Sequence, residues 1–177
     1  MKSQPFPTIP NDRGDYKTYK TDEEWKRALG PLQFKILRLG ATEQPYTGDY
    51  CGHSGPGIYY SAATGQPLFL SETKFESGCG WPSFFAPVLQ ESILYRTDLA
   101  HGMVRTEIID SSSGSHLGHV FPDGPPPTGL RYCVNSAAMI FVGANQKTPP
   151  IVEKYLNEYA SEAEKKIVKE FISNALC

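Results

Sequence analysis

The amino-acid sequence predicts a mainly β domain with helices near both ends of the chain. Aromatic and β-branched runs, broken by Gly, Pro and Ser, fill the stretch from about Gly57 to Val142. No helical pattern alternates with these short runs, so the strands are expected to pair antiparallel rather than through βαβ crossovers. Helical patterns stand outside this stretch, before it at Thr21 and after it at Pro149.

The composition is that of one folded domain. The 177 residues can bury a core, and a hydrophobic content of 40% excludes a disordered chain. The net charge of −2 provides no basic stripe, so nucleic acid is not an expected partner. No apolar run approaches the roughly 18 residues of a membrane-spanning helix, so no membrane association is expected. The N-terminus has no apolar signal core, and four scattered cysteines make no disulfide scaffold, so a cytoplasmic, reducing location is expected.

The N-terminal region is expected to contain an extended arm and one short helix. Residues 1–20 carry several Pro and Tyr and should be extended. The sequence Thr21-Asp22-Glu23-Glu24 has the pattern of a capping box, in which the first and fourth side chains bond to each other's backbone amides. It predicts a helix through Trp25 and Leu29 that Gly30-Pro31 stops.

Six strands are expected in the central stretch. Each is a short run rich in aromatic and β-branched residues, bounded by residues that favour turns. The expected strands are Ile58–Ser61, Leu68–Ser71, Ile93–Arg96, Met103–Ile109, His119–Phe121 and Leu130–Val142.

Pro149-Pro150 opens a long amphipathic helix at the C-terminal end. Its apolar residues recur at helical spacing and form one stripe. Such a stripe usually docks on its own domain, and binding of a partner is the alternative. The stripe consists of Val152, Tyr155, Leu156, Tyr159, Ala163, Ile167, Val168, Phe171 and Ile172.

The segment Gly114–Ser136 concentrates the reactive side chains. As a strand, Leu130–Asn135 alternates strictly, so Arg131, Cys133 and Asn135 share one face while the intervening residues point into a core. A thiol beside a fixed cation is a setting that favours the reactive thiolate. The alternative is an ordinary buried cysteine. The polar neighbours on the same face argue against it, because a core cysteine gains nothing from them.

Three motifs, in this order, closely resemble the signatures of the B-type methionine sulfoxide reductases, which reduce the R epimer of methionine sulfoxide. They are SGCGWPSFF at 77–85, HLGHVF at 116–121 and DGPPPTGLRYCVNS at 123–136. The resemblance runs from about Thr42 to about Val142. It implies two packed antiparallel sheets with peripheral helices. It also suggests three parts: an N-terminal arm and short helix over 1–41, a catalytic β domain over 42–148, and a C-terminal helical extension over 149–177 packed on the same domain.

The resemblance implies a thiol mechanism without a cofactor. Cys133 is then the nucleophile, which attacks the sulfoxide sulfur, releases methionine and becomes a sulfenic acid. Cys79 is the resolving thiol, whose disulfide with Cys133 is reduced by thioredoxin. Cys51, in a Gly-rich stretch, is the alternative resolving thiol, and Cys177 at the C-terminus ranks third. The implied substrate is methionine-R-sulfoxide, free or in peptides and proteins, in a repair reaction of the oxidative stress response.

His116 and His119 match the proton donors implied by the resemblance, and imidazole has a suitable pKa. Residues three apart on a regular strand face opposite sides, so Gly118 must permit a bulge or turn if both are to face the nucleophile. Arg131 would favour the thiolate, and Asn135 would donate a hydrogen bond within the pocket.

Trp81 offers an apolar seat for the sulfoxide methyl group, through burial and sulfur–aromatic contact. Phe84, Phe85 and Phe121 can line the same pocket, with at least one of them belonging to the ordinary core. Asp123 is expected to orient a histidine or Arg131. A simple Asp-Gly turn is the alternative for Asp123.

The chain departs from many relatives at four positions. Where they carry two C-x-x-C pairs that hold a structural zinc ion, this sequence has Ser61 and Thr64, then Asp110 and Ser113. Hydroxyls are poor replacements for thiolates, and one carboxylate does not hold zinc by itself. The sequence therefore predicts that no metal is bound there.

Three other functions compete with this interpretation. A hydrolase or transferase could use a Cys–His pair, but it would leave Cys79 and Trp81 without roles. A metal-binding module could use Cys133, His116 and His119. A catalytically silent relative is the third alternative, and the intact reactive residues argue against it.

Overall fold

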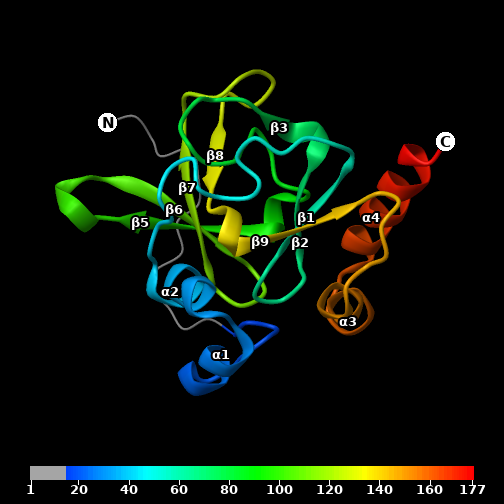
Figure 1. Ribbon diagram of the computed structural model, residues 1–177, viewed down its shortest axis with the longest axis horizontal. Coiled ribbons are helices and arrows are strands. Elements are labelled where there is room, and N and C mark those ends of the chain that lie inside the picture. Colours follow the sequence, from blue (N-terminus) through cyan, green and yellow to red (C-terminus); the bar gives the residue numbers. More distant parts are fainter. Residues whose placement is uncertain (1–14) are drawn as a thin grey trace.

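Two antiparallel β-sheets pack against each other at the centre of the protein in the computed structural model, which describes residues 15–177 (Figure 1). One sheet has six strands and the other has three, and helices from the two ends of the chain lie around them. The predicted fold class, mainly β with two packed antiparallel sheets and peripheral helices, is confirmed.

The larger sheet has the strand order β3-β4-β8-β7-β6-β5, and the smaller has the order β2-β1-β9. The strands are β1 Gly57–Ser61, β2 Pro67–Leu70, β3 Lys74–Phe75, β4 Ser83–Phe84, β5 Ile93–Asp98, β6 Arg105–Asp110, β7 His116–Phe121, β8 Arg131–Val134 and β9 Met139–Gly143. The helices are α1 Asp22–Ala28, α2 Pro31–Leu39, α3 Pro150–Glu158 and α4 Glu162–Ala175, and short 3₁₀ turns include η3 Ala100–Gly102 and η4 Ser136–Ala138.

Most expected strands appear close to their predicted places, as β1, β2, β5, β6 and β7. The single strand expected over Leu130–Val142 is wrong. It forms β8 and β9, which lie in different sheets, because the turn η4 carries the chain from one sheet to the other. The sequence patterns also missed β3 and β4, which have two residues each and are too short to show a period.

Aromatic side chains from both sheets meet in the main core. The rings of Phe69 in β2 and Phe84 in β4 stack with centroids 4.4 Å apart. Tyr132 of β8 packs against Phe69, and its hydroxyl shares a hydrogen bond of 2.8 Å with that of Tyr95. Tyr132 therefore faces the core as the alternation predicts, which directs its neighbours Arg131 and Cys133 to the opposite face.

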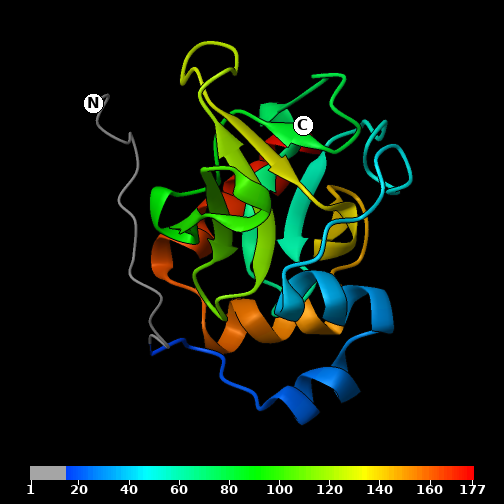
Figure 2. The same cartoon turned by 90° about the vertical axis from the view of Figure 1, so that its left-hand side faces the viewer.

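Two helices, rather than the one expected, cover the N-terminal side. The capping box is present, with the Thr21 hydroxyl accepting from the Glu24 amide and the Glu24 carboxylate accepting from the Thr21 amide. The first helix ends before Gly30-Pro31 as expected, and Pro31 also begins α2, because proline has no amide to satisfy at a first helical position. Helix α2 packs on β7 and η4 (Figure 2).

Part of the extended arm expected over 1–20 lies outside the described residues. Residues 15–20 form neither helix nor strand. Among residues 15–177, no helix is both long enough and apolar enough to cross a bilayer.

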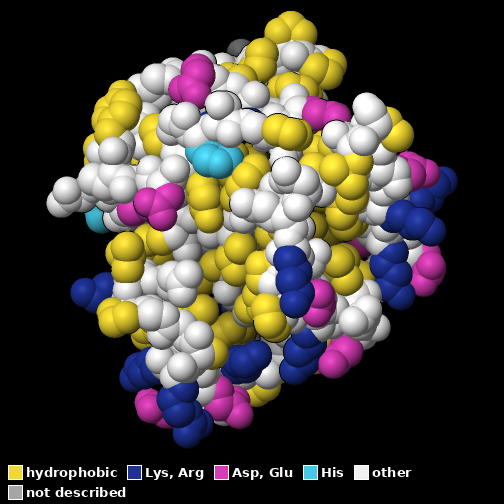
Figure 3. Space-filling view, turned by 45° about the vertical axis from the view of Figure 1, so that its right-hand side comes forward, with side chains coloured by type: hydrophobic (Ala, Val, Ile, Leu, Met, Phe, Trp, Pro, Cys, Tyr) yellow, Lys and Arg dark blue, Asp and Glu magenta, His cyan; other side chains and the backbone are white. Residues whose placement is uncertain are grey.

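The C-terminal region also forms two helices in place of the single one expected. Ser161 separates them because its side chain accepts a hydrogen bond from the Glu164 amide and caps α4. Both helices pack on the small sheet, where Val152, Val168 and Phe171 meet a strand pair formed by β1 and β9. On the face in Figure 3, which brings these helices forward, positive and negative side chains are interspersed around apolar ones.

Candidate active site

A line of polar and nucleophilic side chains crosses one face of the larger sheet. Cys133 of β8 is paired with Ser83 of β4 on one side and with His119 of β7 on the other. Glu107 of β6 and Arg96 of β5 continue the same line of paired residues. Directly paired residues on neighbouring strands project to the same side. The five side chains therefore share the face opposite the core.

A β-bulge in β7 places His116 on the same face as His119. The pairing of β7 with β6 shifts at Ile108–Ile109, which leaves Leu117 as an extra residue. The two imidazole rings lie 5.6 Å apart in an edge-to-face arrangement. A side chain at Gly118 would collide with the backbone of β8. The expected bulge is therefore confirmed by the pairing with β6, and Gly118 beside it allows the close approach of β8.

A pocket of about 220 Å³ opens over this face. It brings together most of the residues singled out in the sequence, but His116 and Asp123 do not line it. Phe84 belongs to the main core instead. The lining comprises Thr42, Cys79, Trp81, Arg105, Gly118, His119, Phe121, Arg131, Cys133, Val134 and Asn135.

The two cysteine thiols of the pocket are in contact. The sulfur atoms of Cys79 and Cys133 lie 3.7 Å apart, and both are free thiols. Cys79 belongs to the loop between β3 and β4, where the Ser77 hydroxyl donates to its sulfur at 3.0 Å and the Ser83 hydroxyl lies 3.4 Å away. The loop therefore holds a second sulfur atom directly over the one on the strand.

The two thiols differ in acidity. Burial would raise the pKa of Cys79, but the hydroxyls of Ser77 and Ser83 outweigh burial and lower the pKa to about 7. Burial and the neighbouring Cys79 raise the pKa of Cys133 to about 12, and Arg131 opposes this shift without reversing it. Arg131 thus acts in the expected direction, but the first proton leaves the pair from Cys79.

Arg131 is held over the pocket by two neighbours. Its guanidinium makes two hydrogen bonds with the Asp123 carboxylate, at 2.9 and 3.1 Å. It also lies over the Phe121 ring, 4.5 Å from the centroid. Of the two partners considered for Asp123, the structure places it on Arg131.

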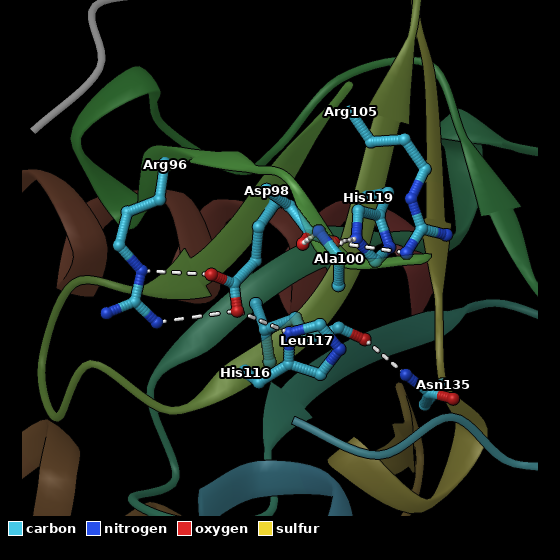
Figure 4. Close-up of polar contacts among 9 residues, drawn as sticks. Arg96, Asp98, Ala100, Arg105, His116, Leu117, His119 and Asn135 are labelled. Carbon is cyan, nitrogen blue, oxygen red and sulfur yellow. Dashed lines mark hydrogen bonds and ion pairs between the residues drawn. The ribbon is translucent and has the colours of Figure 1, made fainter. Parts of the chain in front are cut away.

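Each histidine is bonded to a carboxylate, and each carboxylate to an arginine (Figure 4). The Asp98 carboxylate lies 2.7 Å from His119 Nε2 and 3.1 Å from the Arg105 guanidinium. Burial would raise the pKa of Asp98, but the amide of Ala100 and the two side chains lower it. An ionised carboxylate only accepts hydrogen bonds, so Nε2 of His119 carries hydrogen.

His119 therefore has Nδ1 as the ring nitrogen available for other partners. Burial is the main cause that lowers the pKa of His119. The neutral ring is consequently favoured near pH 7, and proton donation from Nδ1 requires that the ring gain a proton as the reaction proceeds.

His116 belongs to a second set of charged side chains, next to the set that contains His119. The Glu107 carboxylate is 2.6 Å from His116 Nδ1 and 2.9 Å from the Arg96 guanidinium. His116 Nε2 is buried and has no hydrogen-bond partner among the described residues. His116 therefore stands beside His119 rather than against the pocket.

Sequence reasoning missed Asp98 and Glu107, although a signal was present. Charged residues recur at every second position on two adjacent strands, Arg96 and Asp98 on one and Arg105 and Glu107 on the other. This pattern indicates one charged face, and its partners become visible only once β6 is paired with β7.

Asn135 acts mainly on the backbone. Its amide nitrogen donates to the carbonyl of Leu117, the bulge residue, and its amide oxygen accepts from the Glu43 amide, both at 2.9 Å. It lines the pocket while fixing the end of β8 to the bulge.

Hydrogen bonds link the four positions at which the resemblance predicts the loss of zinc-binding cysteines. The Ser61 hydroxyl donates to Asp110 at 2.8 Å, and the amide and hydroxyl of Ser113 donate to the same carboxylate at 2.7 Å. Thr64 bonds to the Ser112 hydroxyl, which in turn donates to Asp110. Asp110 is fully buried, and burial raises its pKa. Its oxygens already accept these bonds, so this donor set does not fit zinc.

Comparison with known proteins agrees with the family resemblance of the three sequence motifs. Residues 29–143 match the model of the SelR domain. The chain is 54% identical over 125 residues to the peptide methionine sulfoxide reductase MsrB of Agrobacterium fabrum, an alignment covering 71% of this chain and 93% of the relative. It is 56% identical over 122 residues to that of Thiobacillus denitrificans, covering 69% and 92% respectively.

The Asp110 cluster should stabilise the fold without metal. Asp110→Ala should lower the free energy of unfolding by at least about 2 kcal/mol, because it leaves several buried donors unsatisfied at about 1–3 kcal/mol each. Denaturant unfolding measures this loss, and Asp49→Ala, at an exposed aspartate, is the control. A chelator should leave the melting temperature unchanged. Stoichiometric zinc with a chelator-sensitive melt would contradict the assignment.

The acidity of Cys79 should be visible in its alkylation. The thiolate is the reactive form, so the alkylation rate should rise about tenfold per pH unit below the pKa and level off above about pH 7. Mass spectrometry assigns the modified residue after timed exposure to iodoacetamide. Cys51, whose pKa is raised by burial and by Glu76, is the internal control and should react only at higher pH. Parallel profiles for the two thiols would contradict the prediction.

Proposed function

Because the chain belongs to the SelR-domain family of MsrB peptide methionine sulfoxide reductases, we propose that it reduces methionine-R-sulfoxide, free or in proteins, to methionine. The observation that carries the proposal is the contact between the thiols of Cys79 and Cys133, 3.7 Å apart in a pocket that Trp81 and His119 also line. A nucleophile and a second thiol are what a reaction needs when it removes an oxygen atom and leaves a disulfide.

In the first step Cys133 reduces the sulfoxide. The Cys133 thiol gives up its proton, which passes to the substrate oxygen by way of His119, and the new thiolate attacks the substrate sulfur. The sulfoxide is reduced by two electrons and leaves as methionine, while the Cys133 thiol becomes a sulfenic acid carrying the oxygen. The raised pKa of Cys133 keeps its charge low until that transfer. Arg131, beside it, stabilises the charge when it forms.

His119 protonates the substrate oxygen as the sulfur–oxygen bond weakens. It is directly paired with Cys133 across β7 and β8, so an atom bound to the nucleophile lies within its reach. Asp98 holds the ring by Nε2 and favours the imidazolium electrostatically, which leaves Nδ1 to donate. His116 supports this arrangement through its edge contact with His119.

The pocket selects the R epimer by giving each substituent of the sulfur one place. The Trp81 indole, whose Nε1 donates to the Glu43 carbonyl at 3.1 Å, presents an apolar seat for the methyl group. The oxygen lies toward His119, and the remaining chain leaves the pocket near Phe121. In the S epimer the methyl group and the oxygen would exchange places.

In the second step Cys79 resolves the sulfenic acid. Its sulfur attacks that of Cys133, the disulfide forms, and the oxygen leaves as water. Thioredoxin then returns both cysteines to thiols by thiol–disulfide exchange. The lowered pKa of Cys79 makes it the better attacking thiol near neutral pH. This requirement for a dithiol reductant agrees with a cytoplasmic location.

An acyl-transferring Cys–His enzyme is the less favoured candidate. It would need one cysteine, and a second thiol in contact with the nucleophile would compete with the acyl group. The alternative of a metal module is also disfavoured, because residues 15–177 contain no group of three His, Cys, Asp or Glu side chains placed to hold a metal ion.

Activity should be specific for one epimer and should depend on Cys133. With separated sulfoxides and a thiol reductant, the R epimer should be reduced and the S epimer should not. Cys133→Ser should abolish turnover, because a hydroxyl is barely ionised near pH 7. Methionine release measured by chromatography tests both. Comparable rates with the two epimers would refute the proposed function.

Removal of Cys79 should separate the two steps. Cys79→Ser should release about one methionine per enzyme and then stall with thioredoxin, because only the first step survives. Cys51→Ser is the matched control and should turn over normally. Peptide mapping after one equivalent of sulfoxide should recover the Cys79–Cys133 disulfide. Full thioredoxin-driven turnover by Cys79→Ser would transfer the resolving role to Cys51.

A further inference from the structure

Tyr46 makes hydrogen bonds on both sides of Cys79. Its amide donates to the Gly80 carbonyl at 2.8 Å, and its hydroxyl donates to the Gly78 carbonyl at 2.6 Å. The two acceptors are the residues immediately before and after Cys79. One residue from a distant part of the sequence therefore spans the peptide that carries this thiol.

Burial of its side chain does not explain the backbone conformation of Tyr46. Its φ of 64° lies in the left-handed region, which residues other than glycine seldom adopt, and its side chain is 69% exposed. Glycine at position 80 lets the two segments touch, because a Cβ there would come within 2.6 Å of Pro45. The unfavourable backbone is retained where it allows both hydrogen bonds to the Cys79 loop.

The same segment is fixed at its other end to the strand of the nucleophile. Glu43 is buried, and its carboxylate accepts from the amides of Ser136 and Ala137. Its own amide donates to the side chain of Asn135. The segment Glu43–Tyr46 thus connects the end of β8, two residues after Cys133, to the loop of Cys79.

We propose that Tyr46 is a positioning residue for disulfide formation, holding the Cys79 loop so that its sulfur stays within reach of Cys133. The inference rests on the proposed function, in which the Cys79 thiol and the Cys133 sulfenic acid form a disulfide and water. Loops that contain paired glycines have many accessible conformations, and Gly78 and Gly80 flank this thiol. Two hydrogen bonds to one anchored residue remove much of that freedom.

Tyr46 does not line the pocket, so it should act on only one of the two steps. The first step uses Cys133 on β8, His119 on β7 and Trp81, which shares the Cys79 loop but whose indole has its own hydrogen bond to the Glu43 carbonyl. The second step depends on where the Cys79 loop lies. A change confined to the second step therefore distinguishes positioning of the loop from a general effect on the fold.

The test compares Tyr46→Phe with Tyr50→Phe in single-turnover reactions with methionine-R-sulfoxide. Tyr46→Phe keeps the ring and the backbone bond but removes the hydrogen bond to Gly78. Methionine release should stay within about twofold of wild type, while loss of the sulfenic acid, trapped with dimedone, should slow by roughly two- to tenfold, the factor that one net hydrogen bond supplies. Tyr50→Phe removes a hydroxyl that accepts from the Phe141 amide and should change neither rate.

A second variant makes the test independent of the hydroxyl alone. Tyr46→Gly relieves the left-handed backbone and removes the phenol, and it should slow disulfide formation at least as much as Tyr46→Phe. Wild-type disulfide rates in both variants would overturn the inference, as would equal slowing of both steps. Absence of methionine release from the wild-type protein would instead refute the proposed function.

Discussion

The antiparallel pairing of β8 between β4 and β7 is the constraint on which the rest of the site depends. Side chains alternate along a strand, so a slip of one residue would send Cys133 into the core and bring Tyr132 to the pocket. The core face prevents this slip, because Tyr132 packs against Phe69 and shares its hydroxyl bond with Tyr95. Packing on one face of the sheet thus determines which atoms meet on the other.

With the register fixed, the reactivity of the site depends on which side chains the surroundings keep neutral and which they keep ionised. Burial disfavours a thiolate at Cys133, while the hydroxyl groups around Cys79 stabilise a thiolate there. The first negative charge of the pair therefore lies on Cys79, the sulfur that reacts second. The same logic governs the histidines. Burial opposes the cation on His119, and the Asp98 carboxylate partly compensates. Both reactive groups therefore rest in their neutral forms and change charge only when a neighbouring group supplies or accepts the proton.

Sequence patterns correctly predicted the features that depend only on neighbouring residues. The alternation around Cys133, the bulge at Gly118 and the capping box at Thr21 each depend on a few consecutive residues. The features that the sequence patterns did not predict depend on contacts between residues far apart in the chain. The strand expected over Leu130–Val142 breaks because Glu43, more than ninety residues earlier, binds the amides of Ser136 and Ala137. Asp98 and Glu107 gain their roles only through strand pairing, which local periodicity does not specify.

The Asp110 cluster connects two turns of the fold by hydrogen bonds between buried side chains. Asp110 ends β6, and Ser61 ends β1, so their hydrogen bond joins the ends of two strands that belong to different sheets. Helix α2 reinforces the connection, since Arg38 donates to the Ser113 carbonyl and the Ser115 hydroxyl. The residue that follows, His116, begins β7 and its bulge. A buried carboxylate with its hydroxyl donors therefore holds the turn that leads into the bulge, and with it the strand that carries His119.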